Sequence, residues 1–543
     1  MDWPYPRRSY KDHDEEKKWV EKINEELRKP QENGMSLMTP SIFMAPAPLR
    51  GLKQQAFIPQ VVPIGPYHCD VGPHHSSFPA NHESQRYIDI AAREMESHKI
   101  MTFKYVAKNF KEGHSICSLA SKFESKVREI KQEYGSQLAC SQNHKRLALM
   151  LALDASFVVE VLKCNAEDAN IGNAKQSLSA STSYKQYWQA CWKRSTSGLQ
   201  NGIMRQGEDE AMRQENVMQS TLSDTDRCFN PYYCSGFPLP LRKSILQDFV
   251  LLENQIPLFC LLEVVQMEES CKPGTPTEAG KILGPLVVQM ASEVLPFNVN
   301  MSYKTELVER MSKNLGSRKH LLDCLYAILT FDPSTKEDPK EYPKEDLDFD
   351  PTHFPRAVEL HNSGISFEQQ RDSTNLMHVH FDPKTAKLHM PKVRVGDDTE
   401  RLFRNLIAYE SHKINNVTVL SYLRFMNNLV NDEDDVALLI QKGIITEDIG
   451  SDLEVAHMWN NLCVNTVRVC SKSYENTAQQ MREHCNRRVN RWKAEVKRTY
   501  IDKPWLFLSL VSGFSLLLMT LIILIYTILL YLKPEPGAME ILP

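Results

Sequence analysis

Side chains that could bind a metal ion gather in one short stretch of this 543-residue chain, "YHCDVGPHH" at residues 67–75. It contains His68, Cys69, Asp70, His74 and His75, and His82 follows soon after. Zinc prefers imidazole and thiolate ligands, but structural zinc sites usually present them at regular CxxC or HxxxH spacing. This stretch has neither spacing and is flanked by Pro and Gly. We therefore interpret it as a solvated loop, with a metal site as the alternative.

A second group of histidines lies on a predicted β-hairpin. Residues 376–382 and 386–393 have the composition of strands and flank "DPKT", a turn with Pro at its second position. His378 and His380 would share one strand face, and a two-residue loop would place His389 opposite His378. Three imidazoles on one face could bind zinc. Pro in the loop favours a longer turn, however, so we interpret these residues as surface histidines.

Two sets of residues could serve in acid–base catalysis. Asp154 lies in "LALMLALDASFVVEVL", a segment that is apolar on almost all sides and predicts a central core helix. A carboxylate buried there must find a partner, because an unpaired one would cost several kcal/mol. Glu94 and His98 are four residues apart, which places them on one helical face. A structural contact is the simpler interpretation of both, and catalysis is the alternative.

The stretch "DFVLLENQIPLF", residues 248–259, interrupts an apolar helix with three polar residues and a proline. Pro257 has no N–H and disfavours helical geometry at the preceding residue, so a helix that begins near Leu241 must kink or stop there. Glu253, Asn254 and Gln255 can then bind the exposed backbone groups. We interpret these three side chains as structural, and a catalytic or binding role for Glu253 is the alternative.

The organisation along the chain predicts a mainly α protein with a small β-hairpin or sheet. A charged N-terminal segment (1–39) precedes a mostly helical body (40–500), which contains a polar insertion (165–226) and an acidic, Pro-rich linker (332–351). The net charge of −4 argues against a nucleic-acid partner. Thirteen cysteines without a CxxC pair indicate reduced thiols and a cytosolic body. No signal peptide is evident at the N-terminus.

Residues 505–532 predict a transmembrane helix. These 28 residues carry no charge, and at 1.5 Å per residue they extend about 42 Å, more than the roughly 30 Å hydrocarbon core. Seven basic residues precede the helix, whereas Lys533 alone follows it; the seven are Arg487, Arg488, Arg491, Lys493, Lys497, Arg498 and Lys503. The positive-inside rule then places the body in the cytoplasm and the short tail (533–543) on the other side. We expect a single-pass, tail-anchored protein, and the plasma membrane is the expected location.

Several blocks of this sequence together resemble the plant domain-of-unknown-function family 247 (DUF 247). "VLLENQIPLF" resembles the family signature, and further blocks follow in the family's order over roughly residues 41–532; they include "SIFMAPAPLRGLKQQAFIPQVVPIGPYH", "EMESHK", "LALDASFVVEVL", "ERLFRNLIAYE" and "KPWLFLSLVSG". The signature residues among these blocks are Glu96, His98, Asp154, Glu253, Asn254, Gln255 and Pro257, which we interpret as structural. The resemblance implies a plant protein with a C-terminal membrane helix. It also implies no assigned chemistry, although some grass members are implicated in pollen–stigma self-incompatibility.

Two classes of function remain open from the sequence. The chain contains no Walker loop, GxSxG elbow, HExxH, EF-hand or kinase signature. We therefore expect no catalytic, cofactor-binding or metal-binding residue. The first hypothesis is a membrane-anchored recognition protein with an unknown protein partner, such as a pollen-side determinant or a signalling component in self-incompatibility. The alternative is a membrane-tethered hydrolase or metal-dependent enzyme that uses Asp154, Glu253 or the histidines of residues 68–82, and a cleft that joins Asp154, Glu253 and His98 would favour it.

Overall fold

The computed structural model assigns the chain to two units, residues 1–40 and 41–543, and the second unit is described below. The described residues are 40–68, 95–107, 110, 116–134, 143–173, 239–269, 276–298, 301–331, 354–370, 377–412, 417–448, 450–467, 471–487 and 504–532. The predicted N-terminal segment, the linker 332–351, the tail 533–543 and most of the insertion lie outside them. The first part of that insertion is helical, because α6 continues through Asn173.

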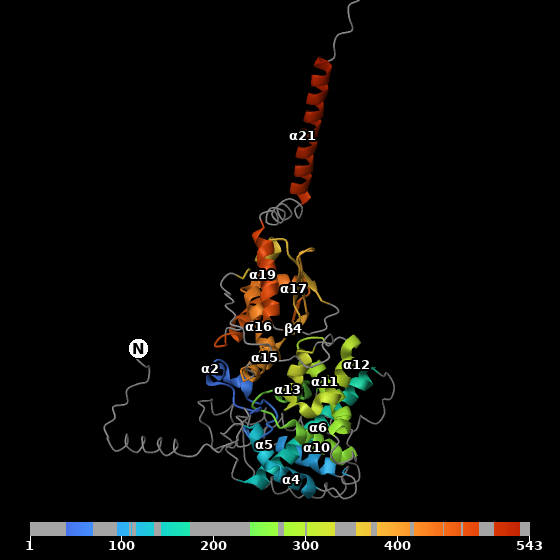
Figure 1. The fold of residues 1–543 in the computed structure, drawn as a ribbon, viewed down its shortest axis with the longest axis vertical. Helices are drawn as coiled ribbons and strands as arrows, with labels where there is room; N and C mark the ends of the chain where they lie inside the picture. Colours follow the sequence, from blue (N-terminus) through green and yellow to red (C-terminus); the bar gives the residue numbers. More distant parts are fainter. Residues whose placement is uncertain are drawn as a thin grey trace, which may run out of the picture. The chain divides into compact units, whose positions relative to one another are not determined.

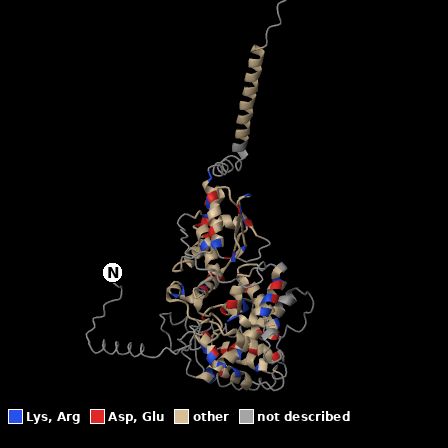
Figure 2. Cartoon of the chain, viewed as in Figure 1, with Lys and Arg blue, Asp and Glu red and all other residues tan. Residues whose placement is uncertain are grey.

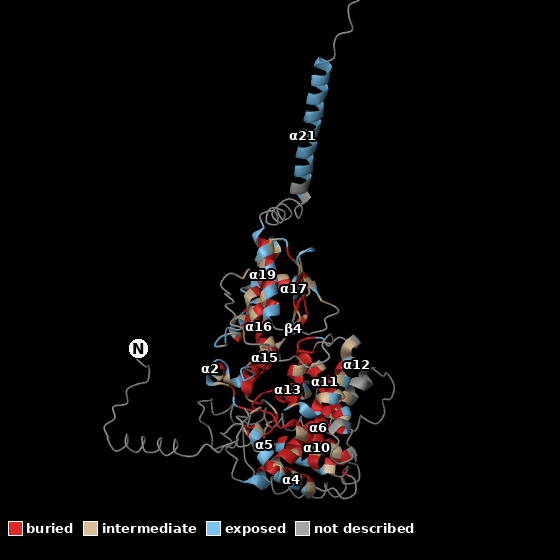
Figure 3. Ribbon diagram, in the orientation of Figure 1, coloured by how far each residue is buried: buried red, intermediate tan, exposed pale blue. Residues whose placement is uncertain are grey.

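Helices form most of the described chain, which confirms the mainly α prediction (Figure 1). The first group is α4 (Ile116–Ser125), α5 (Val127–Glu133), α6 (His144–Asn173), α9 (Leu239–Asp248), α10 (Leu258–Glu269), α11 (Pro276–Val294), α12 (Met301–Asn314) and α13 (Leu321–Leu329). Helix α6 packs against α4, α10 and α11. Most apolar side chains between Leu147 and Cys164 are buried, as expected for a central core helix, although Leu149 is exposed (Figure 3).

The later part of the body combines helices with short strands. Its helices are α14 (Ala357–Asn362), α15 (Asp397–Glu410), α16 (Thr418–Leu429), α17 (Glu433–Gln441), α18 (Asp452–Leu462) and α19 (Lys472–Asn486). Its strands are β1 (Ser366–Gln369), β2 (His380–Asp382), β3 (Lys387–Met390), β4 (Val393–Val395) and β5 (Ile445–Glu447). They form a three-stranded sheet in the order β1-β3-β2 and a parallel β4-β5 pair. The predicted small β element is therefore present.

The predicted hairpin is the β2–β3 pair, with a longer connection than two residues. Its register pairs Phe381 with Leu388 and His380 with His389, and residues 383–386 connect the strands. The register with His378 opposite His389, which a two-residue loop would have required, is wrong. The longer turn follows from Pro383, whose fixed φ does not suit the left-handed geometry of short hairpin loops.

The predicted helix break at "LLENQIP" is also present. Helix α9 ends at Asp248 and α10 begins at Leu258, directly after Pro257. The break is longer than a kink, because residues 249–257 form turns and extended chain between the two helices. These residues are nonetheless buried, and Asn254 has no exposed surface.

Residues 41–68 form a segment that we name the N-terminal strap. It contains two short helices, α2 (Ala47–Arg50) and the 3-10 helix η1 (Gln54–Phe57), and is otherwise non-helical, as its Pro and Gly content predicts. Ile42 forms a β-bridge with Tyr134, and its N–H donates to the carbonyl of Glu133 at 2.8 Å. Much of the strap is buried, and Phe57 and Val62 have no exposed surface.

The last described helix is α21 (Pro504–Tyr531). Its segment Leu508–Tyr531 has a mean hydropathy of 2.5 and is long and apolar enough to cross a membrane by length and composition. The helix bears neither acidic nor basic side chains, and its residues from Leu508 onward are exposed (Figures 2 and 3). The predicted apolar helix therefore exists as a continuous element.

Candidate functional site

Buried polar side chains, among them Asp154, Glu253 and Asn254 of the signature, meet at the N-terminal strap, where they satisfy the backbone of a buried, non-helical segment. Asp248, at the end of α9, accepts hydrogen bonds from three consecutive N–H groups, those of Gln60, Val61 and Val62, at 2.9, 2.7 and 2.8 Å. The guanidinium of Arg401, on α15, donates to the same carboxylate at 2.8 Å. Burial raises the pKa of Asp248, while the charge of Arg401 and the three donors oppose that shift.

Asp154 binds the strap a few residues further along. Its Oδ2 accepts the N–H of Gly65 at 2.9 Å, and its Oδ1 is 2.8 Å from Nζ of Lys99. Lys99 also donates to the carbonyl of Pro63 at 2.5 Å, so the ion pair and the strap share one cation. Gly65 has φ of +72°, and a Cβ there would be 2.5 Å from the carbonyl oxygen of Gln255. The central acid of α6 therefore has both a cation and a backbone donor as partners.

Glu253 binds the beginning of the strap. Its Oε1 accepts the N–H of Ala45 at 3.0 Å, and Nη1 of Arg50 is 2.7 Å from both carboxylate oxygens. His68 Nε2 lies 3.9 Å from Oε2 of the same carboxylate. Burial, together with the nearby Arg50, lowers the pKa of His68 from 6.5 to about 4, so this imidazole is neutral at neutral pH.

Asn254 and Gln255 cross-link the break between α9 and α10. Asn254 accepts the N–H of Ile64 at 2.7 Å and donates to the carbonyls of Val62 and Asp248 at 3.0 and 2.9 Å. Gln255 donates to the carbonyls of Phe249 and Leu251, both at 2.7 Å, and accepts the N–H of Leu322 at 3.3 Å. Both amides therefore bind backbone groups left without helical partners at the break.

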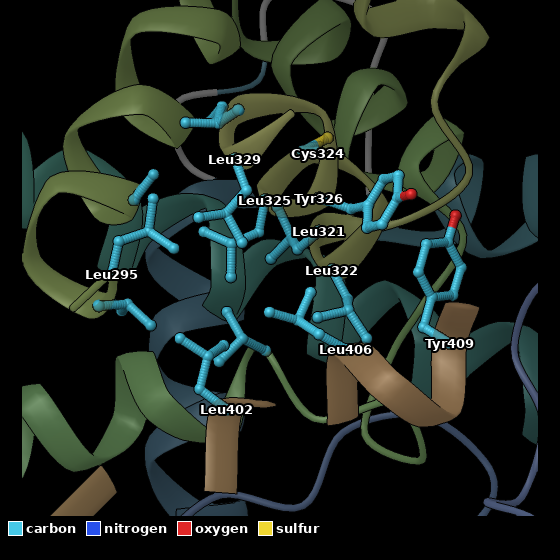
Figure 4. Packing of buried hydrophobic residues seen from close by; sticks show 14 of the residues in the cluster. Leu295, Leu321, Leu322, Cys324, Leu325, Tyr326, Leu329, Leu402, Leu406 and Tyr409 are labelled. Atoms are coloured by element: carbon cyan, nitrogen blue, oxygen red, sulfur yellow. The ribbon is translucent and has the colours of Figure 1, made fainter. Parts of the chain in front are cut away.

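A second buried network connects α13 to α15, beside the apolar side chains of both helices that Figure 4 shows. The hydroxyl of Tyr409 donates to Asp323 at 2.6 Å, and that of Tyr326 donates to Glu410 at 2.9 Å. Nδ1 of His320 accepts the N–H of Asp323, so Nε2 carries the proton and donates to the carbonyl of Ser41 at 3.0 Å. The start of the strap is thereby joined to both helices. Leucines of α13 pack beside Leu402 and Leu406 of α15 next to these polar groups.

Sequence reasoning missed the partners of the signature residues. Arg50, Lys99 and Arg401 supply the three cations, and Asn405 accepts the N–H of Leu252 and donates to the carbonyl of Ala56, both at 2.8 Å. A charged or amide side chain on the apolar face of a predicted helix could have indicated these partners. Asn405 and Arg401 both meet that description within "ERLFRNLIAYE".

The remaining acidic and basic signature residues are Glu96 and His98, and Glu96 is linked to Asp154 through Lys99, whose Nζ contacts both carboxylates. Glu96 is exposed and its Oε1 is 2.6 Å from Nζ of Lys99, whereas His98 is half-buried. Glu94, the other member of the suggested pair with His98, lies outside the described residues. Asp154 and Glu253 each bind a cation and a different part of the strap. This arrangement gives no support to the hydrolase hypothesis.

The histidine-rich stretch can be followed only at its beginning. His68 is buried, and Cys69, Asp70, His74, His75 and His82 lie outside the described residues. Among the residues that are described, no group of three or more His, Cys, Asp or Glu side chains is arranged to hold a metal ion.

The geometry defines a class of protein: a mainly α body closed over a buried N-terminal strap, followed by an apolar helix of membrane-spanning length. The chain belongs to the DUF247 family, described as "Plant protein of unknown function", whose model matches residues 42–519. The predicted family resemblance is thereby confirmed.

Two plant proteins illustrate the relationship. The putative UPF0481 protein At3g02645 of Arabidopsis thaliana is 22% identical over 583 residues, which cover 93% of this chain and 93% of that protein. The UPF0481 protein At3g47200 of the same plant is 27% identical over 322 residues, 55% of this chain and 63% of that protein. No solved structure matches the chain.

The contacts of Glu253 and Asn254 predict that both residues stabilise the fold. Glu253→Ala and Asn254→Ala should each lower the free energy of unfolding by about 1–3 kcal/mol, because buried donors and acceptors lose their partners. Urea unfolding of the full chain in detergent, followed by tryptophan fluorescence, measures this change. Glu359→Ala is the matched control, because the side chain of Glu359 is 59% exposed and its ion pair with Arg356 is long, at 3.9 Å. Unchanged stability combined with lost partner binding would instead assign these residues to recognition.

The low pKa of His68 predicts a loss of stability in acid. In the unfolded chain the imidazole binds a proton below about pH 6.5, whereas the folded chain resists protonation down to about pH 4. The contribution of the neutral His68 to the free energy of unfolding is therefore complete above pH 6.5. It is lost as the pH falls towards 4, and the loss is up to about 3 kcal/mol. Urea unfolding between pH 7 and 4 should show a shallower pH dependence for His68→Gln than for the natural chain. If the two curves remain parallel, or if His457→Gln at an exposed position has the same effect, the assignment to His68 is wrong.

Proposed function

We propose that this protein is a membrane-anchored recognition protein: α21 fixes it in a lipid bilayer, and the helical body binds another protein beside that membrane. The observation that carries the proposal is α21 itself, in which Leu508–Tyr531 combine a mean hydropathy of 2.5 with no burial. An apolar helix of this length in water would expose far more apolar surface than soluble proteins tolerate. A bilayer supplies the environment that such a helix requires.

The arrangement of the body supports recognition in preference to catalysis. Its buried carboxylates Asp154, Asp248 and Glu253 bind backbone N–H groups and cations of the same chain. Groups committed in this way hold the fold and have little capacity left for a substrate. Binding to a partner would then use exposed side chains, which tolerate substitution better than the buried network.

The charges around α21 support a cytoplasmic body and a single-pass topology. Seven basic residues lie between Arg487 and Lys503, and Lys533 follows the helix. Basic residues near a span remain on the cytoplasmic side, so the tail 533–543 would lie on the opposite side. We place the protein at the plasma membrane, where recognition between cells takes place, and self-incompatibility between pollen and stigma is the specific process that the family resemblance suggests.

Membrane attachment through α21 predicts a clear result on truncation. A chain without residues 505–543 should move from the membrane fraction to the soluble fraction, because the removed helix supplies the apolar contact with lipid. Alkaline carbonate extraction followed by fractionation measures the partition. A full-length chain with Leu517→Ala is the control, since α21 keeps its length and apolar character. Continued membrane association of the truncated chain would refute the anchor.

Recognition by this protein predicts where partner specificity resides. Residues 165–226 and 332–351 are polar segments, the second with four prolines in twenty residues, and substitutions in both should cost little folding energy. Exchange of these segments between two alleles should transfer the partner preference, measured as binding of each allele's partner or as pollen rejection. The control exchange replaces "VLLENQIPLF" with its counterpart from the other allele. If specificity follows the helical body, recognition lies elsewhere.

A further inference from the structure

His380, His389 and Glu368 lie on one face of the β1-β3-β2 sheet, a third histidine precedes β2, and the proposed function makes no use of them. Successive side chains of a strand point to opposite faces of its sheet. Phe367, Leu388 and Phe381 form a buried row across the three strands. The neighbouring row on the opposite face is Glu368, His389 and His380, with His378 two residues before His380. We name these four residues the histidine face.

The strand register brings two imidazoles directly opposite each other. His380 on β2 and His389 on β3 are partners in the antiparallel ladder, where the Cβ atoms of facing residues are about 4.5–5.5 Å apart. Two nitrogens bound to one zinc ion at about 2.0–2.1 Å are roughly 3.3 Å apart in tetrahedral geometry. Facing imidazoles can reach that separation through their staggered rotamers. The ring of His378 lies 6.3 Å from that of His380 and is nearly parallel to it.

Glu368 lies on the other side of His389, since β3 is between β1 and β2. Its Oε2 is 3.8 Å from Nδ1 of His389, and its Oε1 is 2.5 Å from Nζ of Lys387. A carboxylate beside one ring nitrogen favours the tautomer with the proton on that nitrogen, and the other nitrogen is then available to a metal ion. Glu368 is therefore placed to orient the His389 ring.

We propose that the histidine face binds a divalent transition-metal ion that prefers imidazole, with His380 and His389 as ligands and Glu368 as a positioning residue. Zn²⁺, Cu²⁺ and Ni²⁺ share this preference. The described residues contain no converging set of three ligands, so water completes the coordination. Such a site is open and exchanges its ion readily. The side chains of His389 and Glu368 are 30% and 42% exposed, which gives the ion direct access from solvent.

Zinc binding to the full chain in detergent tests this proposal. Equilibrium dialysis of a tag-free protein against Zn²⁺ should show one more bound equivalent for the natural chain than for the double variant H380Q/H389Q. The comparison removes any contribution of the stretch 67–82, which is present in both proteins. H144Q/H457Q, which changes two exposed histidines elsewhere, should retain that equivalent. Equal zinc content of the natural chain and H380Q/H389Q, with both folded by circular dichroism, overturns the site.

Two further measurements examine the roles of the individual residues. With Cu²⁺ as the probe, the electron paramagnetic resonance spectrum should show coupling to two imidazole nitrogens that H380Q/H389Q lacks. E368Q should keep the same number of bound zinc ions but weaken their binding roughly ten- to hundredfold, as loss of an orienting carboxylate does elsewhere. An unchanged zinc affinity in E368Q would show that Glu368 does not position His389, and an unchanged Cu²⁺ spectrum in H380Q/H389Q would overturn the proposed ligands.

Discussion

Hydrogen bonding of the N-terminal strap is the constraint on which the rest of the body depends. A buried segment without regular secondary structure cannot pair its own N–H groups, and each unpaired donor costs about 1–3 kcal/mol. The strap therefore takes its acceptors from other elements: Asp154 from α6, Asp248 from α9, and Glu253 and Asn254 from the break before α10. Because these acceptors come from separate helices, the strap fixes the positions of those helices relative to one another.

The charges in this arrangement explain why the signature combines acids, amides and a proline. A buried carboxylate needs a cation, and Asp154, Asp248 and Glu253 have Lys99, Arg401 and Arg50. Buried ion pairs add little net stability compared with apolar packing, yet removal of one partner is expensive because the other charge remains buried. Pro257 contributes by ending the helical hydrogen bonding, which leaves backbone groups without helical partners. Asn254 and Gln255 then bind these groups. Substitution of any one of these residues is therefore costly, because its buried partner would be left without a hydrogen bond or a counter-charge.

Local patterns were enough to predict several elements and none of the long-range partners. Continuous apolar character revealed α6 and α21, and Pro257 revealed the break, because these signals depend on neighbouring residues alone. The pairing of Asp248 with Arg401, 153 positions apart, depends on packing that no local period encodes. The hairpin lies between these cases: its existence followed from composition, but its register depended on a turn of four residues. Partners and registers are tertiary properties, and one sequence shows only that a partner must exist.

The same network bears on where evolution can place recognition in such a protein. Around the strap, Asp248 already accepts four donors and Asn254 uses both its oxygen and its nitrogen, so a new contact there would displace one that holds the fold. Exposed positions carry no such obligation. If the protein binds a partner as proposed, partner preference can therefore change at the surface without changing the signature residues. The residues whose hydrogen bonds hold the N-terminal strap determine the fold, and they are different residues from the exposed ones that can be substituted freely.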